Sequence, residues 1–523
     1  MAHFQIVSKR SCLHPKPEGL LLQYGTAGFR TNAKHLDHIM FRMGLLATLR
    51  SKKTKATIGV MVTASHNPEE DNGVKLIDPL GEMVTPTWEG FATKLANAEQ
   101  ADLVTALKDV IEKEAINISQ EANVFTFYAF YYYGLVTTPM LHYMVRCQNT
   151  QGEYGEATVE GYYKKLSDAF FQLTKNAINC TDDQKHLSVD GANGIGAVKL
   201  REMEGYLKNE LHITLFNDGS KGKLNYQCGA DFVKVQQKAP TGLKMNPGER
   251  GCSFDGDADR IVYYYTDAEE KFHLLDGDKI STLISTFLKE LLTQAGLVLK
   301  IAVVQTAYAN RSSTQYLEDI MKVPVRCTKT GVKHLRHAAQ EFDIGVFFEA
   351  NGHGTVLFST AAEEKIQQLV ENPSTDEEAK RAAVILQNTV NVINQAVGDA
   401  VSDMLLIEAI LAIKGMTIQQ WDAIYTDLPN RQLKVKVLDR RAIDTTDAER
   451  RAVSPAGLQE AIDSLVKKHR RARSFVRPSG TEDVVRVYAE AETQESADTL
   501  AYEVSLAVYR LAGGVGDEPK PLH

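Results

Sequence analysis

A serine, a histidine and a lysine lie close together directly after an apolar, strand-like run. The stretch VTASHNPEEDNGVKL, residues 62–76, contains Ser65, His66 and Lys75. A serine hydroxyl is a weak nucleophile, but it can carry a phosphoryl group as an ester when neighbouring groups activate it. Lys75 could supply a positive charge or act as a general base. The alternative is an ordinary Ser-Asn turn closed by the proline that follows.

Three aspartates alternate along a second stretch, CSFDGDADRIVYYY, at residues 252–265. In an extended loop Asp255, Asp257 and Asp259 project to the same side. Because nearby carboxylates repel one another unless a cation lies between them, the spacing predicts a metal site rather than a solvated acidic turn. Oxygen-only ligands favour Mg²⁺ or a similar hard cation. A calcium EF-hand is excluded, because its glycine and glutamate positions hold arginine and threonine here.

Polar residues among glycines follow a third apolar run, in the stretch FFEANGHGT at residues 347–355. Glu349, Asn351 and His353 suit the hydroxyl groups of a sugar. The alternative is a glycine turn in which the histidine has no role.

A fourth stretch, RPSGTEDVVRVYAEA at residues 477–491, combines arginines with a short polar turn. Guanidinium groups, hydroxyls and backbone amides together bind anions well. The alternative is a tight turn between two strands. The residues of the predicted anion site are Arg477, Ser479, Gly480, Thr481 and Arg486.

The elements that position these stretches indicate an α/β fold. Short apolar runs at residues 57–62, 187–190, 301–306 and 343–349 alternate with helical patterns. Ligands of such folds bind beyond the carboxyl ends of the strands, where the polar loops lie. After residue 430 the order becomes strand, helix, strand, strand, helix, which predicts a small α+β domain. The glycines of SVDGANGIGA have the wrong spacing for a dinucleotide-binding fingerprint.

The composition is that of an ordinary globular protein. The 523 residues carry a net charge of −8, which disfavours a general nucleic-acid binder. The six cysteines are scattered without a C-x-x-C pair, which favours a reducing compartment over a disulfide framework or a zinc site. The N-terminus shows no apolar signal core and no run is long enough to span a bilayer, so we expect a cytoplasmic protein.

Together and in this order, the four stretches resemble the α-D-phosphohexomutase superfamily. Its marks are the loops T-A-S-H-N-P, D-G-D-A-D-R, E-x-x-G-H and R-P-S-G-T-E. Within it, Y-G-T-A-G-F-R at residues 24–30, E-A-N-G-H-G-T at 349–355 and the stretch at 477–491 are most similar to the phosphoacetylglucosamine mutase family. The resemblance implies three α/β domains with mixed sheets plus a small C-terminal α+β domain around a central cleft. The implied domains are residues 1–158, 159–297, 298–428 and 429–523.

The resemblance also implies a reaction and a role for each residue. N-acetylglucosamine 6-phosphate and 1-phosphate would interconvert through a phosphoserine and a bisphosphorylated sugar, which supplies UDP-N-acetylglucosamine synthesis. The implied cofactor is Mg²⁺, the implied partner is the sugar phosphate alone, with no nucleic acid or membrane, and the chain would be a monomer. Ser65 would carry the phosphoryl group and share Mg²⁺ with Asp255, Asp257 and Asp259. Arg30, His66, Lys75 and Arg260 would line the transfer site, with Lys75 as general base. The implied substrate ligands are Thr330, Gly331, Glu349, Asn351, His353 and the anion-site residues.

One segment departs from the superfamily pattern. A G-R-D-x-R-x-S segment and a helix normally precede the T-T-P loop, but here one aromatic run enters that loop directly, within residues 121–139. Since a parallel crossover needs about a dozen connecting residues, we expect the first domain to lack a helix. An inactive or weakened sugar-phosphate-binding protein is therefore an alternative. A Mg²⁺-dependent phosphatase with an aspartate nucleophile is disfavoured, because Asp259 stands where its motif has threonine or valine.

Overall fold

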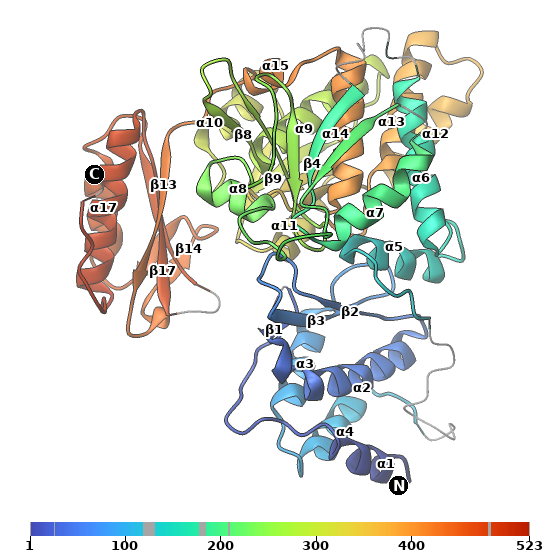
Figure 1. The fold of residues 1–523 in the computed structure, drawn as a ribbon, viewed down its shortest axis with the longest axis vertical. Helices are drawn as coiled ribbons and strands as arrows, with labels where there is room; N and C mark the ends of the chain where they lie inside the picture. Colours follow the sequence, from blue (N-terminus) through green and yellow to red (C-terminus); the bar gives the residue numbers. More distant parts are fainter. Residues whose placement is uncertain are drawn as a thin grey trace. The chain divides into compact units, whose positions relative to one another are not determined.

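The computed structural model describes residues 2–25, 27–118, 131–175, 177, 185–207, 210–479 and 483–521. The chain forms two compact units, each built from discontinuous segments (Figure 1). Unit 1 comprises residues 1–276, 351–355 and 383–418, and unit 2 comprises residues 277–350, 356–382 and 419–523. Among the described helices, none is both long and apolar enough to cross a bilayer.

Unit 1 contains two sheets among its described residues. The first has the strand order β1-β3-β2 with antiparallel pairing throughout. The second has the order β5-β4-β6-β7-β8 and is mixed, because β4 runs parallel to both neighbours while β6, β7 and β8 are antiparallel. The strands are β1 (Phe29–Asn32), β2 (Gly59–Thr63), β3 (Asp71–Ile77), β4 (His186–Asp190), β5 (His212–Phe216), β6 (Gly251–Phe254), β7 (Ile261–Thr266) and β8 (Phe272–Leu275).

Helices cover both faces of the first sheet. Val74 and Leu76 pack with helix α2 in one apolar cluster, whereas Met61 and Ile77 pack with Val145 of helix α5 in another. This two-sided burial follows from the alternation of side chains along β2 and β3. The helices of unit 1 are α1 (Ala2–Ser11), α2 (Asp37–Thr54), α3 (Pro86–Asn97), α4 (Leu103–Lys113), α5 (Thr138–Asn149), α6 (Val159–Thr174), α7 (Ile195–Met203), α8 (Ala230–Gln236) and α14 (Ala400–Lys414), with most of α13 (Glu377–Val392).

Unit 2 contains a four-stranded sheet of order β10-β9-β11-β12, in which β9 runs parallel to β10 and β11. Its strands are β9 (Ile301–Thr306), β10 (Val325–Thr328), β11 (Ile344–Phe348) and β12 (Gly354–Phe358), whose first two residues are assigned to unit 1. Its helices are α9 (Gly277–Gln294), α10 (Arg311–Gln315), α11 (Val332–Ala339), α12 (Thr360–Glu371) and α15 (Ile418–Asp422).

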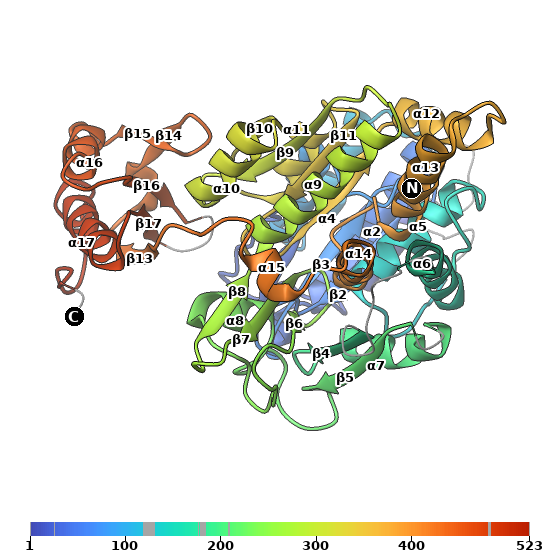
Figure 2. The same cartoon turned by 90° about the horizontal axis from the view of Figure 1, so that it is seen from above.

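The last hundred residues of unit 2 form an antiparallel sheet β13-β17-β16 with a separate hairpin β14-β15 (Figure 2). Helices α16 and α17 pack against each other and bury one face of this sheet around Val485, Val487 and Leu500. The elements are β13 (Asn430–Lys436), β14 (Asp444–Thr446), β15 (Arg451–Ser454), α16 (Leu458–Val466), β16 (Arg473–Pro478), β17 (Val484–Glu490) and α17 (Gln494–Leu511).

The predicted α/β class is confirmed, because parallel and mixed sheets alternate with helices along the chain. The described strands of the first sheet, β1, β2 and β3, pair antiparallel. The expectation that the first domain lacks a helix rests on residues 121–139, of which 121–130 lie outside the described residues. Residues 131–137 form neither strand nor helix, and the side chains of Tyr132 and Leu135 are 82% and 79% exposed. The domain boundaries at 158, 297 and 428 remain predictions.

Candidate active site

Ser65 lies in a strained turn just beyond the carboxyl end of β2. Its φ of 55° is left-handed, which is costly for a non-glycine residue and is frequent at functional positions. Its backbone N–H donates to the Thr63 hydroxyl at 2.9 Å, and its carbonyl accepts from the Asn225 side chain at 2.8 Å. The hydroxyl lies 3.4 Å from Nδ1 of His66. The turn is therefore held on both sides, and only 4% of Ser65 is exposed.

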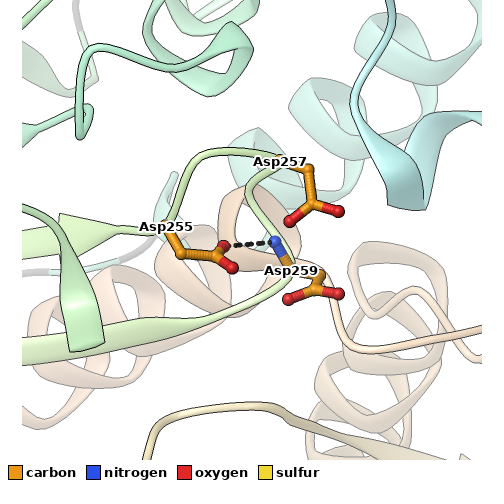
Figure 3. Close-up of side chains that lie close together, drawn as sticks. All are labelled: Asp255, Asp257 and Asp259. Atoms are coloured by element: carbon orange, nitrogen blue, oxygen red, sulfur yellow. Dashed lines mark hydrogen bonds between the residues drawn. The ribbon is translucent and has the colours of Figure 1, made fainter. Parts of the chain in front are cut away.

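The three aspartates form a buried cluster in the loop between β6 and β7 (Figure 3). One carboxylate oxygen from each lies within 4.8 Å of the others. The Asp259 N–H donates to Oδ1 of Asp255 at 3.0 Å, which closes the loop around the cluster. Three carboxylate oxygens are buried without a hydrogen bond in the part of the chain that the structure describes. They are Oδ2 of Asp255, Oδ1 of Asp257 and Oδ1 of Asp259. Because buried carboxylate oxygens need a partner, this donor set fits a hard divalent cation.

The serine loop and the aspartate loop touch each other. Oδ2 of Asp257 accepts from the hydroxyls of Thr63 at 2.9 Å and Thr138 at 2.6 Å. A Cβ at Gly256 would lie 2.4 Å from the Ser65 carbonyl oxygen, so only glycine permits this approach. The predicted phosphoserine and the predicted metal loop are thus parts of one site in unit 1.

Cations surround the two loops. Nζ of Lys75 lies 4.0 Å from Oδ2 of Asp259, and Nε of Arg260 lies 3.9 Å from Asp255 and 3.8 Å from Asp259. Arg30 donates a hydrogen bond from Nη1 to the Thr63 carbonyl oxygen. These side chains can offset the charge of a phosphoserine and a metaphosphate-like transition state.

Burial and charge shift the pKa values within the site. Burial, together with the charges of Asp259 and Asp257, raises the pKa of Asp255 well above its usual range. Burial opposes ionisation of Asp259 as well, but His353, Lys75 and Arg260 hold its pKa well below its usual range. Burial and the nearby Arg260 lower the pKa of His66 to about 4, so its imidazole is neutral near pH 7. A bound cation would keep all three aspartates ionised.

The side chain of His353 packs against the aspartate loop. Its Nδ1 is 2.8 Å from the Asp259 carbonyl oxygen and 3.3 Å from its Oδ1, and 6% of the residue is exposed. The Asn351 side chain accepts from the His353 N–H at 3.0 Å. Gly352 between them has a φ of 86°, and a Cβ there would lie 1.9 Å from the Ile261 carbonyl oxygen. The expected role of Asn351 and His353 on sugar hydroxyls remains a prediction.

The remaining predicted ligands lie in unit 2. The Gly331 N–H donates to Oε1 of Glu349 at 3.1 Å. Both the N–H and the hydroxyl of Thr330 donate to Oε2 of Glu449, at 2.9 and 2.6 Å. The other oxygen of Glu449 accepts from Nε of Arg477 at 3.0 Å.

Two arginines face each other on the C-terminal sheet. Arg477 of β16 and Arg486 of β17 are directly paired positions of the antiparallel ladder. Like charges at such positions destabilise a sheet unless an anion lies between them. The Ser479 N–H donates to the Val484 carbonyl oxygen at 2.9 Å, which closes the turn after β16. Gly480 and Thr481 lie outside the described residues.

Sequence patterns alone did not reveal Thr63, Thr138, Asn225 or Glu449. Thr63 and Thr138 stand beside recognised loops, but a threonine at the end of a strand gives no signal of its own. Asn225 contacts Ser65 within unit 1, and Glu449 contacts Thr330 within unit 2. Each belongs to a loop far away in the sequence from its partner, and no local pattern marks it.

Four family models match this chain in order. They are phosphoglucomutase/phosphomannomutase alpha/beta/alpha domain I at residues 45–101, phosphoacetylglucosamine mutase AMG1 domain II at 154–262 and domain III at 276–416, and the phosphoglucomutase/phosphomannomutase C-terminal domain at 433–507. The class is therefore that of the hexose-phosphate mutases.

Relatives that align over nearly their full length show which family within this class the chain belongs to. Human phosphoacetylglucosamine mutase is 66% identical over 98% of this chain and 99% of its own length, and the Candida albicans protein is 46% identical over 96% and 98%. The solved structure of Aspergillus fumigatus N-acetylphosphoglucosamine mutase superposes with a TM-score of 0.93 at 47% identity, covering 98% of this chain and 99% of that one. The chain belongs to the phosphoacetylglucosamine mutase family.

Proposed function

We infer that this protein is a Mg²⁺-dependent isomerase that interconverts N-acetylglucosamine 6-phosphate and N-acetylglucosamine 1-phosphate. The observation that carries this function is the left-handed Ser65 packed on the buried aspartate cluster through Thr63 and Gly256. A related Aspergillus fumigatus structure, 47% identical, is described as a complex with GlcNAc-6P and magnesium. A serine-to-alanine variant of that enzyme is described in complex with glucose 1,6-bisphosphate.

In this mechanism Ser65 carries the phosphoryl group and passes it to the free hydroxyl of the sugar phosphate. The bisphosphorylated sugar then turns in the site and returns its other phosphate to Ser65. Mg²⁺, held by Asp255, Asp257 and Asp259 with an oxygen of the phosphoserine, would neutralise charge on the transferred group. Lys75 would take the proton of the attacking hydroxyl, and Arg30 and Arg260 would offset the remaining negative charge.

The other end of the substrate binds through unit 2. The paired Arg477 and Arg486 would hold the phosphate that is not reacting, with Ser479 and, by the family resemblance, Gly480 and Thr481. Glu349, Asn351 and His353 would contact sugar hydroxyls, with Thr330 and Gly331 as a further substrate loop. Support for these roles comes from the donor types and, for the phosphate, from the like-charged pair, whose repulsion a bound anion would offset.

The setting of the reaction follows from the same inference. The product supplies UDP-N-acetylglucosamine synthesis, which we place in the cytoplasm. The chain would act as a monomer made of four domains, residues 1–158, 159–297, 298–428 and 429–523. We propose no nucleic-acid partner, in keeping with the net charge of −8.

The chain is shortened near residues 121–139, but none of these groups is lost. The alignment to the human relative extends over 537 positions, more than the 523 residues of this chain, so that relative carries residues absent here. Ser65, the aspartate loop and both substrate loops are all retained. We therefore infer an active mutase rather than an inactive binding protein.

The decisive experiment combines intact-mass analysis with a coupled mutase assay. Incubation with a labelled bisphosphorylated sugar should add one phosphate to the wild-type protein and none to Ser65→Ala. The wild type should form the 1-phosphate without releasing inorganic phosphate, whereas a phosphatase would release it. Labelling of Ser65→Ala equal to wild type, or label uptake with no turnover, would contradict the inferred function.

A further inference from the structure

Glu449 is a carboxylate placed against the predicted phosphate site. Its Oε1 accepts from Nε of Arg477 at 3.0 Å, and its Oε2 accepts from the N–H and hydroxyl of Thr330. Its side chain is 13% exposed, so the ion pair is partly shielded from water. An acidic side chain beside an anion site repels an anionic ligand. A neutral hydrogen-bond acceptor could also hold the arginine in place, so positioning alone does not require a negative charge.

The donors that Glu449 engages are those that a phosphate would use. A guanidinium, a hydroxyl and a backbone N–H are a typical set for an oxyanion. Both the N–H and the hydroxyl of Thr330 donate to Glu449. Thr330 can therefore bind a substrate oxygen only after its hydrogen bonds to the Glu449 carboxylate break. The Glu449 carboxylate therefore occupies an anion site, and the anion in that site is a group of the protein itself.

The backbone is built to present this side chain. Asp447, Ala448 and Glu449 have φ values of 52°, 54° and 68°, three consecutive left-handed residues without a glycine among them. Such backbone strain persists only where the surrounding structure imposes it. Here the hairpin of β14 and β15 closes around the turn.

We propose that Glu449 is an internal competitor for Arg477, which weakens the phosphate clamp so that the bisphosphorylated sugar can leave it. The proposal rests on the inferred function, because only a mutase must release each phosphate from the clamp once per reaction. Positive charge from both Arg477 and Arg486 would otherwise hold a dianionic phosphate for longer than turnover allows. When the phosphate leaves, the carboxylate pairs with the guanidinium and keeps the clamp from recapturing it.

The test is the variant Glu449→Gln, which removes the charge and keeps the shape of the side chain. Isothermal titration calorimetry with inorganic phosphate should show affinity about 3- to 30-fold tighter than wild type, because one nearby negative charge is removed. In the coupled assay, KM for N-acetylglucosamine 6-phosphate should fall together with kcat. Rapid quenching during turnover should show a larger fraction of enzyme-bound sugar bisphosphate.

The matched control is Asp439→Asn, an acid-to-amide change outside the turn of Glu449. The side chain of Asp439 is exposed and pairs with Arg441 at 2.8 Å, so phosphate affinity and both kinetic constants should match wild type. Weaker or unchanged phosphate binding by a folded Glu449→Gln protein would overturn the proposal, and weaker binding would show that Glu449 only positions Arg477. If Glu449→Gln misfolds, Glu449→Ala serves in the same titration.

Two results keep this inference separate from the inferred function. Phosphate titration needs no turnover, so a wild type without mutase activity would defeat the function while the affinities of wild type and variant still decide the role of Glu449. Phosphate binding that is unaffected in Arg477→Ala would instead show that the clamp lies elsewhere and would overturn the role of Glu449, while the mutase assay of the wild type still decides the function.

Discussion

The hydroxyl of Thr63 donates to Oδ2 of Asp257 at 2.9 Å while accepting the backbone N–H of Ser65 at the same distance. One buried hydroxyl thus connects the backbone of Ser65, the proposed phosphoryl carrier, with Asp257, a proposed metal ligand. Groups that orient metal ligands contribute to metal affinity and activity even though they do not touch the metal.

Replacing Thr63 by valine should lower turnover about 10- to 100-fold, since loss of such an orienting group typically has that effect. The Mg²⁺ concentration for half-maximal activity should rise as well, which steady-state assays over a magnesium series would measure. Thr48→Val is the control, because the Thr48 hydroxyl donates only to the Gly44 carbonyl within α2. Equal magnesium dependence of Thr63→Val and wild type would contradict this prediction.

Removal of the metal should abolish activity. Treatment with a chelator leaves the aspartate cluster without its charge partner, and added Mg²⁺ should restore turnover. Asp257→Asn should weaken metal binding and activity together, as titration calorimetry with Mg²⁺ and the coupled assay would show. Turnover that survives thorough chelation would exclude a catalytic metal.

Arg477→Ala should weaken binding of N-acetylglucosamine 6-phosphate about 10-fold or more. A hydrogen bond to a charged group contributes about 1.5–3 kcal/mol, and each 1.4 kcal/mol is about tenfold in affinity. Arg441→Ala is the control, because Arg441 is exposed and pairs with its near neighbour Asp439. An unchanged dissociation constant for Arg477→Ala would argue against the phosphate role.

Asp403 of α14 should make the protein less stable at high pH. Both of its carboxylate oxygens are buried without a hydrogen bond among the described residues, and burial together with the charge of Asp399 raises its pKa well above the usual range. An acid with a raised pKa in the folded state holds its proton there, so its destabilising effect is absent at low pH and grows as pH rises above its unfolded pKa. Asp403→Asn should therefore raise the melting midpoint by about 2–5 °C at pH 8.

The same variant should show no advantage near pH 4, which thermal melts across a pH series would test. Asp168→Asn is the control, because Asp168 is exposed on α6. A gain of stability that is independent of pH would place the effect in packing rather than in the charge.

Local chemistry made much of this protein predictable. The alternating aspartates and the Ser65 turn have short spacings, so their sequence alone indicates that each loop forms a site, and the strand at residues 301–306 was predicted with its observed bounds. The hairpin of β14 and β15 was missed, because three- and four-residue strands carry too little pattern. The contacts of Glu449 and Asn225 could not be predicted, because they depend on how distant loops pack.

The division of the chain into interleaved segments has a consequence for how the protein is made. Unit 1 ends with residue 418, and unit 2 takes residues from both sides of that point. Because the chain is synthesised from its N-terminus, unit 1 cannot fold completely until most of the sequence has emerged from the ribosome. The aspartate loop and Ser65 therefore exist for some time without residues 383–418. Buried faces such as that of α14 form late in synthesis, and truncation before residue 414 leaves the first unit without part or all of that helix.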